Sequence, residues 1–266
     1  MGEENAHKIK IFFDESGKGR DYPNLMGGLS IPDKCYIRDE FAGLYQLITD
    51  GKPIHWTEYT GDGKARWRIV QLLETMMPYA DLIKFNCISY KMNQFEELGK
   101  PMNSFFPNIA DETIYTKIPE RVIYGLLRKY GQDTYIDASV YVEHDNSYEQ
   151  KHLKERMLEQ LNIQSLYRAE RYCVSSVEYL LKQKEFGMEL TDVILGIIRT
   201  IIQNSTATSR AKQKKNELVL SLLKDIPNLE EFLKNKVRLY EWNSPAKELM
   251  NIPFENYLSV FKSTQI

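Results

Sequence analysis

The apolar and polar positions near the start of the chain predict a pair of strands. Residues 8–13 alternate at first and then become wholly apolar, which is typical of a strand buried towards its C-terminal end. A second apolar run follows at 25–31, after a loop rich in glycine, lysine and proline. We therefore expect a β-hairpin over 9–31, with Asp14 at the end of its first strand and Gly17 in the turn.

Apolar residues at helical spacing predict helices over 39–49, 64–77 and 187–204, the last with one strongly apolar face. A fourth helix is expected over 111–131, where Pro119 should bend the helix or restart it. Glycine, aspartate or proline bounds most of these segments, which is typical of helix ends.

Further apolar runs predict strands over 81–92, 135–146 and 170–180. A polar helix is expected over 147–162, and the proline-containing segment 93–110 is expected to be a surface excursion or lid. Because helices separate most of these strands, the sequence predicts an α/β protein with a mixed sheet.

The C-terminal part of the chain differs in composition. The stretch "STATSRAKQKKNE", which begins at residue 205, predicts a polar, basic linker, and the last fifty residues are expected to be helical. No internal repeat and no earlier linker is evident. We therefore expect a domain over 1–204 and a helical C-terminal extension over 205–266 that packs on the same domain.

Composition places few limits on function. The chain has 266 residues and 42% hydrophobic content, and its 35 basic and 37 acidic side chains nearly balance, so an anionic partner requires a local patch. The cysteines, Cys35, Cys87 and Cys173, form no metal or redox motif and are interpreted as buried thiols in a reducing compartment. Without an apolar signal core or a membrane-length apolar run, a cytoplasmic protein is expected, with its oligomeric state left open.

Acidic residues recur at the ends of predicted elements and suggest a metal site. They are Asp14 after the first strand, Glu58 in a loop, Glu143 and Asp145 after a middle strand, and Asp192 in the late helix. Carboxylates that converge repel one another unless a hard cation such as Mg²⁺ or Mn²⁺ compensates. Two such ions about 3.5–4 Å apart serve phosphodiester cleavage.

Each acid also has an ordinary structural interpretation. Asp14 could form a turn before a glycine, and Glu58 could be a solvated loop residue. The acids of 143–145 could close their strand or cap the next helix. Asp192 could be a first-turn acid behind an N-cap at Thr191.

Two neighbours of these acids matter for the site. His55 precedes Glu58 by three residues and is predicted to relay a proton or contact a scissile phosphate, although a lone histidine is more often structural. Gly196 lies inside the helix that carries Asp192, where glycine costs roughly 1 kcal/mol relative to alanine. We expect another backbone to approach the helix closely there.

Four segments in this order, "IFFDESG", "IHWTE", "VYVEHDN" and "MELTDVILGII", resemble the domain-of-unknown-function family numbered 3800. The resemblance covers about residues 8–204, and its most specific element is the first strand ending in D-E-S-G. It implies a ribonuclease-H-like fold, with a mixed five-stranded sheet flanked by helices. It also implies acids on the first strand, on the central strand and on a late helix.

Transferred to this chain, the resemblance implies Asp14, Glu143 or Asp145, and Asp192 as the metal ligands, with Glu58 as a fourth. The expected function is a nuclease, or a related phosphoryl-transfer enzyme, that depends on Mg²⁺ or Mn²⁺. The alternative is a catalytically silent binding or regulatory module, of the kind that would suit phage defence or mobile-element biology. An actin-like phosphotransferase lacks support because no glycine-rich phosphate loop is evident.

Contacts to nucleic acid are expected from two groups of basic residues. One group lies beside the first acid and the other in the basic linker, where a solvated linker is the alternative. The residues are Lys18, Arg20, Arg210, Lys212, Lys214 and Lys215.

Overall fold

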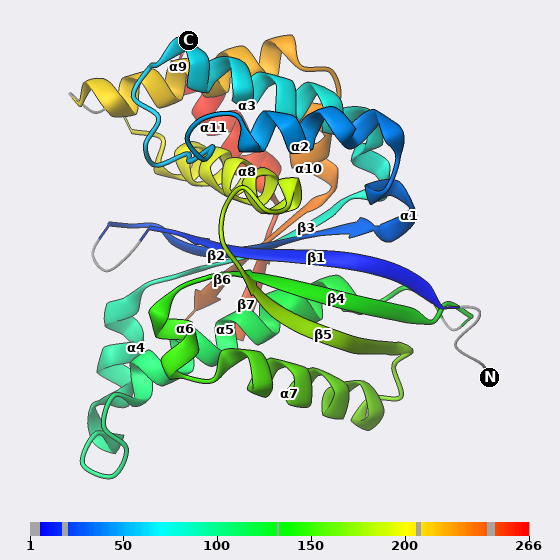
Figure 1. Ribbon diagram of the computed structural model, residues 1–266. Helices are drawn as coiled ribbons and strands as arrows, with labels where there is room; N and C mark the ends of the chain where they lie inside the picture. The colour runs from blue at the N-terminus through cyan, green and yellow to red at the C-terminus, as the bar shows by residue number, and fades with distance from the viewer. Residues whose placement is uncertain (1–5, 18–20, 132, 206–208, 244–247, 266) are drawn as a thin grey trace.

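A mixed sheet of seven strands runs through the middle of the protein (Figure 1). The computed structural model describes residues 6–17, 21–131, 133–205, 209–243 and 248–265. The order across the sheet is β5-β4-β1-β2-β3-β6-β7. The strands are β1 (His7–Ser16), β2 (Asn24–Pro32), β3 (Lys84–Tyr90), β4 (Ile136–Glu143), β5 (Tyr172–Leu180), β6 (Val237–Asn243) and β7 (Glu248–Ile252).

Helices cover both faces of the sheet (Figure 1). On one face lie α1 (Asp33–Tyr36), α2 (Ala42–Thr49), α3 (Gly63–Met76), α8 (Phe186–Gln203), α9 (Arg210–Asp225), α10 (Leu229–Asn235) and α11 (Phe254–Gln265). On the other lie α4 (Met92–Gly99), α5 (Ile109–Leu127), α6 (Asn146–Gln150) and α7 (Leu153–Tyr167). The protein is thus an α/β protein with three layers.

The five strands expected from the sequence form the first part of this sheet. β1 and β2 pair antiparallel as the predicted hairpin, with Ile9 opposite Pro32. β4 lies parallel to β1 on its other side, and β5 lies parallel to β4. The expected number of five strands is wrong, because β6 and β7 continue the sheet beyond β3.

The C-terminal segment is not purely helical as expected. β6 pairs parallel with β3, and β7 pairs antiparallel with β6. The expected basic linker is also largely wrong, because α9 begins at Arg210. Its apolar residues Leu218, Val219 and Leu222 are buried and hold this helix on the domain.

Two other segments differ from expectation. Pro119 does not restart α5, which continues through it from Ile109 to Leu127, and the alternative of a bend stays a prediction. The segment expected to be a surface excursion or lid begins with α4 and becomes turn-like only beyond Gly99. Buried Phe95 stacks on Trp242 of β6 at 5.4 Å between ring centroids, which explains why this helix docks on the sheet.

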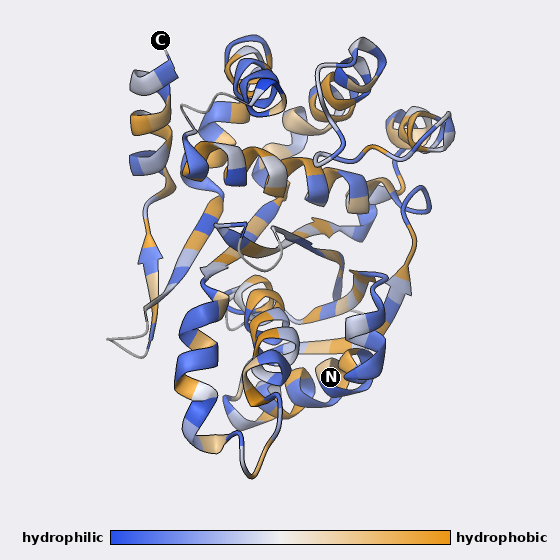
Figure 2. Cartoon of the chain, turned by 90° about the vertical axis from the view of Figure 1, so that its left-hand side faces the viewer, coloured by the Kyte–Doolittle hydropathy of each residue, from blue (hydrophilic) through white to orange (hydrophobic). Residues whose placement is uncertain are grey.

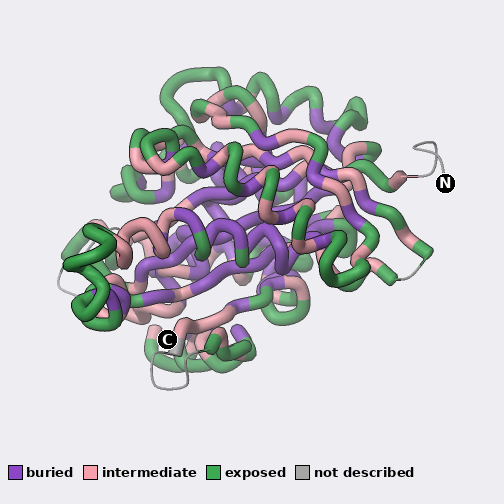
Figure 3. The backbone as a smooth tube through the Cα atoms, turned by 90° about the horizontal axis from the view of Figure 1, so that it is seen from below, coloured by how far each residue is buried: buried purple, intermediate pink, exposed green. Residues whose placement is uncertain are grey.

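Each face of the sheet has its own apolar core. Phe12, Leu25 and the apolar side of α8 belong to one core, and Phe13 and Val122 belong to the other. Apolar residues gather along the strands and on the sides of the helices that meet them (Figure 2). Figure 3 shows the buried residues concentrated in the strands, with exposed residues on the outer helices. The alternation of side chains along each strand divides the residues between the two cores.

Cys35 and Cys87 are buried and Cys173 is partly buried, and all three are free thiols. No helix in the described part of the chain has the length and apolarity needed to cross a membrane.

Candidate functional site

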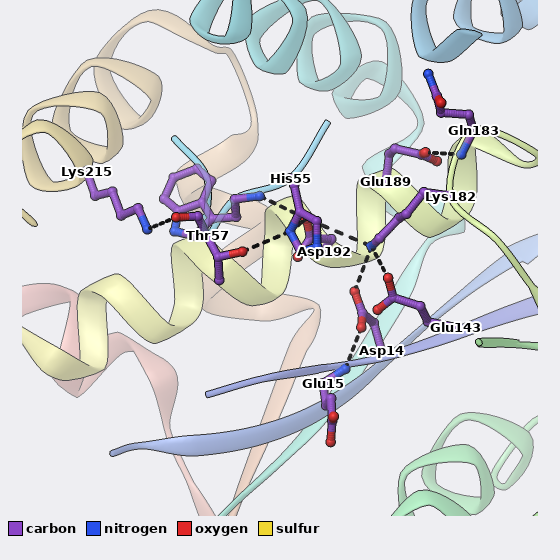
Figure 4. A network of polar contacts seen from close by, with 11 residues as sticks. Asp14, Glu15, His55, Thr57, Glu143, Lys182, Gln183, Glu189, Asp192 and Lys215 are labelled. Carbon is purple, nitrogen blue, oxygen red and sulfur yellow. Dashed lines mark hydrogen bonds and ion pairs between the residues drawn. The ribbon is translucent and has the colours of Figure 1, made fainter. Parts of the chain in front are cut away.

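The first two acids lie side by side at the carboxyl ends of two adjacent strands. Asp14 shares a face of β1 with Phe12, because side chains alternate along a strand, and it is almost completely buried. Glu15 points to the opposite face (Figure 4). The parallel pairing of β1 with β4 places Phe13 beside Val142, so Asp14 and Glu143 follow next in line on adjacent strands. The register of these strands therefore brings the two carboxylates together at the carboxyl ends of the strands.

The third acid comes from α8, which crosses the same face of the sheet. The helix begins at Phe186, as expected from its apolar periodicity, so Asp192 lies well inside it. Thr191 is not an N-cap, because its hydroxyl donates to the carbonyl of Gly187 at 2.7 Å. Asp192 is buried and faces the other two acids, which a first-turn surface acid would not do (Figure 4).

A lysine lies at the point where the three acids converge. The Nζ atom of Lys182 is 3.1 Å from Asp14 Oδ2, 3.2 Å from Glu143 Oε1 and 3.9 Å from Asp192 Oδ2 (Figure 4). Its side chain is only 10% exposed. We call these four residues the carboxylate–lysine cluster. The cluster contains its own cation.

The loop between β5 and α8 fixes the position of this lysine. Gln183 has a left-handed backbone with φ of 67°, and its N–H donates to the Glu189 carboxylate at 2.6 Å. The side-chain amide of Gln183 also donates to the carbonyl oxygens of Ile48 and Gly51, each at 2.8 Å. These bonds anchor the residue next to Lys182 to α8 and to the end of α2.

The electrostatics of the cluster keep the lysine charged. Burial opposes its charge, but the three carboxylates raise the pKa of Lys182 above its usual value. Burial also tends to raise the pKa of Asp14, yet Lys182 and a hydrogen bond with Glu143 hold that pKa below its usual value. Burial and the adjacent Asp14 raise the pKa of Glu143 to about 9. Burial and Asp14 thus favour the protonated form of Glu143, whereas Lys182 favours the ionised form of Asp14.

Asp192 belongs to the same network and to a second one. Burial raises its pKa, and the charge of Lys182 offsets this only in part. Its Oδ2 atom accepts a hydrogen bond from the backbone N–H of Trp56 at 2.9 Å and lies 3.4 Å from Nδ1 of His55. Thr57 contacts the same ring nitrogen at 3.0 Å. The structure thus brings His55 beside a cluster acid.

Gly196 explains how this loop approaches α8 so closely. A side chain at this position would overlap the indole of Trp56, which lies directly on the helix. The indole N–H donates to Thr200 one turn further on, at 3.2 Å. The expected close neighbour is therefore present, but it is a side chain rather than a backbone. Gly17 directly follows β1 and has a left-handed backbone with φ of 83°, whereas residues 18–20 of the expected turn lie outside the described residues.

Two predicted ligands lie elsewhere. The Glu58 side chain is exposed, and within the described part of the chain no hydrogen bond or ion pair joins it to the cluster. Asp145 is the N-cap of α6, where its carboxylate accepts a bond from the N–H of Ser147 at 2.7 Å. The geometry thus supports the capping alternative for Asp145 and the surface alternative for Glu58.

The basic residues of the predicted linker lie on α9, beside the His55 loop. Lys215 Nζ donates to the carbonyl of Thr57 at 3.0 Å, and burial lowers the pKa of Lys215. Lys214 pairs with Glu217, whereas Arg210 and Lys212 are exposed. The other two basic residues, Lys18 and Arg20, lie outside the described residues.

The carboxylates suit a hard cation in chemical type but are spaced around an ammonium. Within the described ranges, no group of three or more His, Cys, Asp or Glu side chains is placed to hold a metal ion. Oxygens 3.1–3.9 Å from Lys182 Nζ are at ion-pair distances, whereas Mg²⁺ takes oxygens at about 2.0–2.1 Å. A divalent ion would therefore require the oxygens, the lysine or both to shift.

Sequence reasoning missed Lys182, although a signal for it exists. β5 was expected at nearly its observed position, and β5 runs parallel to β4. Its carboxyl end must then lie at the same edge of the sheet as Asp14 and Glu143. A lysine two residues beyond that end is thus placed near both acids.

Comparison of the chain with models of protein families, with curated proteins and with solved structures found no match. The resemblance to the family numbered 3800 therefore stays a prediction.

Proposed function

We propose that the protein is a divalent-metal-dependent phosphodiester hydrolase that acts on nucleic acid, with a ribonuclease-H-like arrangement of its first five strands. The observation that carries the proposal is the convergence of Asp14, Glu143 and Asp192 around the ammonium group of Lys182. The three acids come from β1, β4 and α8. Charges buried in this way require a compensating cation, and carboxylate oxygens are the ligands that Mg²⁺ and Mn²⁺ prefer.

The three carboxylates would hold the metal, which when bound would activate water and offset the charge of a phosphodiester. His55 would orient Asp192, because a protonated imidazole with Nδ1 3.4 Å from the carboxylate oxygen would attract it. Arg210 and Lys212, exposed on α9, would contact phosphates of the substrate. The bond from Lys215 to Thr57 supports this placement, since it joins α9 to the loop of His55.

The test is cleavage of single-stranded, duplex and hybrid oligonucleotides in Mg²⁺ and in Mn²⁺. We expect Asp14→Asn to reduce cleavage by a factor of about a hundred or more, because it removes a ligand charge. Glu15→Gln is the matched control, since it makes the same change on the opposite face of β1 and should retain activity. Equal cleavage by wild type and Asp14→Asn would exclude the carboxylate–lysine cluster as the catalytic site.

One observation favours a second candidate, the catalytically silent module. Lys182 already compensates part of the charge of the three carboxylates. A protein of this kind would bind nucleic acid without cleaving it in either metal. It would also bind no Mn²⁺ in a manner that depends on Asp14, which separates it from the enzyme.

A further inference from the structure

The charges of the carboxylate–lysine cluster limit how many ions it can take. A metal ion binds ionised carboxylates and displaces a proton that they hold. In that state the three carboxylates and one ammonium together carry two formal negative charges. One divalent ion neutralises this charge, whereas two would leave an excess of positive charge in a largely buried site. Repulsion between cations a few ångströms apart is strong where water does not screen it.

The ammonium is a fixed part of this site. The Lys182 side chain is 10% exposed and contacts all three acids. The adjacent Gln183 is bound to Glu189 and to two carbonyl oxygens at the end of α2. A surface lysine could turn away into solvent, but this one would leave buried carboxylates behind and would have to pull against an anchored loop.

The set of ligands for a second ion is also incomplete. Of the four expected carboxylates, Glu58 lies exposed in its loop, and the additional candidate Asp145 caps α6. The three remaining acids share their oxygens with Lys182. Two hard cations that each prefer about six oxygen ligands would have few protein oxygens left between them.

We propose that Lys182 takes the place of one of the two divalent ions, so that the site binds a single Mg²⁺ or Mn²⁺ per chain. The proposal rests on the proposed function, because it requires the cluster to bind metal. It assigns to Lys182 the role of a permanent cation that faces the same carboxylates as the ion.

The experiment counts Mn²⁺ bound to the full chain by equilibrium dialysis, with free Mn²⁺ measured by electron paramagnetic resonance. Wild type is expected to bind one ion that Asp14→Asn loses. Lys182→Met is expected to bind two ions, or one ion at least about tenfold more tightly, because the competing positive charge is gone. Lys184→Met removes the same charge from an exposed position in the same loop and should match wild type.

The outcomes separate the two proposals. Binding of two ions by folded wild type overturns the role of Lys182 while leaving the metal site intact. One ion in wild type, with unchanged number and affinity in Lys182→Met, overturns it as well. If wild type binds no Mn²⁺ that depends on Asp14, the metal site falls and the single-ion proposal falls with it.

Lys182→Met removes a buried ion-pair partner and can destabilise the fold. Circular dichroism and thermal melting therefore accompany the count. Lys182→Arg keeps the positive charge and should still bind one ion, whereas two ions in this variant would contradict the proposal. The wild-type count alone also decides between one ion and two, whatever the stability of the variants.

Discussion

At the scale of single residues, Asp192 is held from two sides. Lys182 approaches it from the loop before α8, and the backbone of Trp56 donates to it from the loop before α3. The second contact depends on Gly196, because the indole of Trp56 occupies the space that a side chain would need. One glycine therefore positions both a cluster acid and its histidine neighbour.

Gly196→Ala tests this dependence. The added methyl group overlaps the Trp56 indole, so we expect a loss of about 1–3 kcal/mol in the free energy of unfolding, despite the better helix propensity of alanine. Urea denaturation measures it. Gly43→Ala, in α2 with open space around it, is the control and should be neutral or stabilising by up to about 1 kcal/mol. Equal stability of the two variants would contradict this account of Gly196.

The residues of the site differ in how far the sequence reveals them. Asp14 and Glu143 follow directly from strand ends, and the strong periodicity of α8 places Asp192 among buried residues. Glu58 and Asp145 have the right chemistry, but a loop conformation and a helix cap decide where they point. The contact of Lys182 with all three acids depends on one left-handed residue, which no periodicity indicates.

At the scale of elements, α9 connects the basic run to the site. The sequence predicted a linker here because lysines and polar residues dominate its first half. Its buried stripe of Leu218, Val219 and Leu222 begins only in the second half. The helix gives its basic residues different surroundings. Lys214 lies along Gly61 and pairs with Glu217, whereas Lys212 is exposed.

The difference in exposure between Lys212 and Lys214 predicts that Lys212 contacts a phosphate backbone. Lys212→Gln should lower the slope of log affinity against log salt by about 0.7–0.9 for oligonucleotide binding, the change expected for one phosphate contact. Fluorescence anisotropy between low and moderate salt measures the slope. Lys214→Gln should change it less, because Glu217 already pairs with that ammonium. A slope in Lys212→Gln identical to that of wild type would remove α9 from the proposed interface.

At the scale of the whole molecule, the C-terminal segment completes the sheet and one of its cores. β6 pairs with β3 in parallel, and Leu239, Phe254, Leu258 and Phe261 are buried in the core that also contains Phe12. The alternation in "VRLYEWN" is a strand signal that an all-helical interpretation overlooked. Its partner could not be predicted, because β6 pairs with a strand far away in the sequence.

A chain ending at residue 204 is accordingly expected not to form a stable domain. It loses the partner of β3 and the apolar side chains of β6 and α11, exposing core surface to water. Size-exclusion chromatography and thermal melting by circular dichroism should show aggregation or a non-cooperative transition. A monomer with a cooperative transition would instead establish residues 1–204 as an independent folding unit.

The position of Lys182 after the fifth strand also bears on the order in which a growing chain acquires its charges. Asp14 and Glu143 leave the ribosome before Lys182 does, and both strands needed to bring these acids together are then already made. Until β5 and its loop emerge, the paired carboxylates lack their internal ammonium. The helix that covers these acids in the folded protein, α8, is made only after Lys182, so until then water can hydrate both carboxylates. The chain thus acquires the lysine before it acquires the helix that buries the acids.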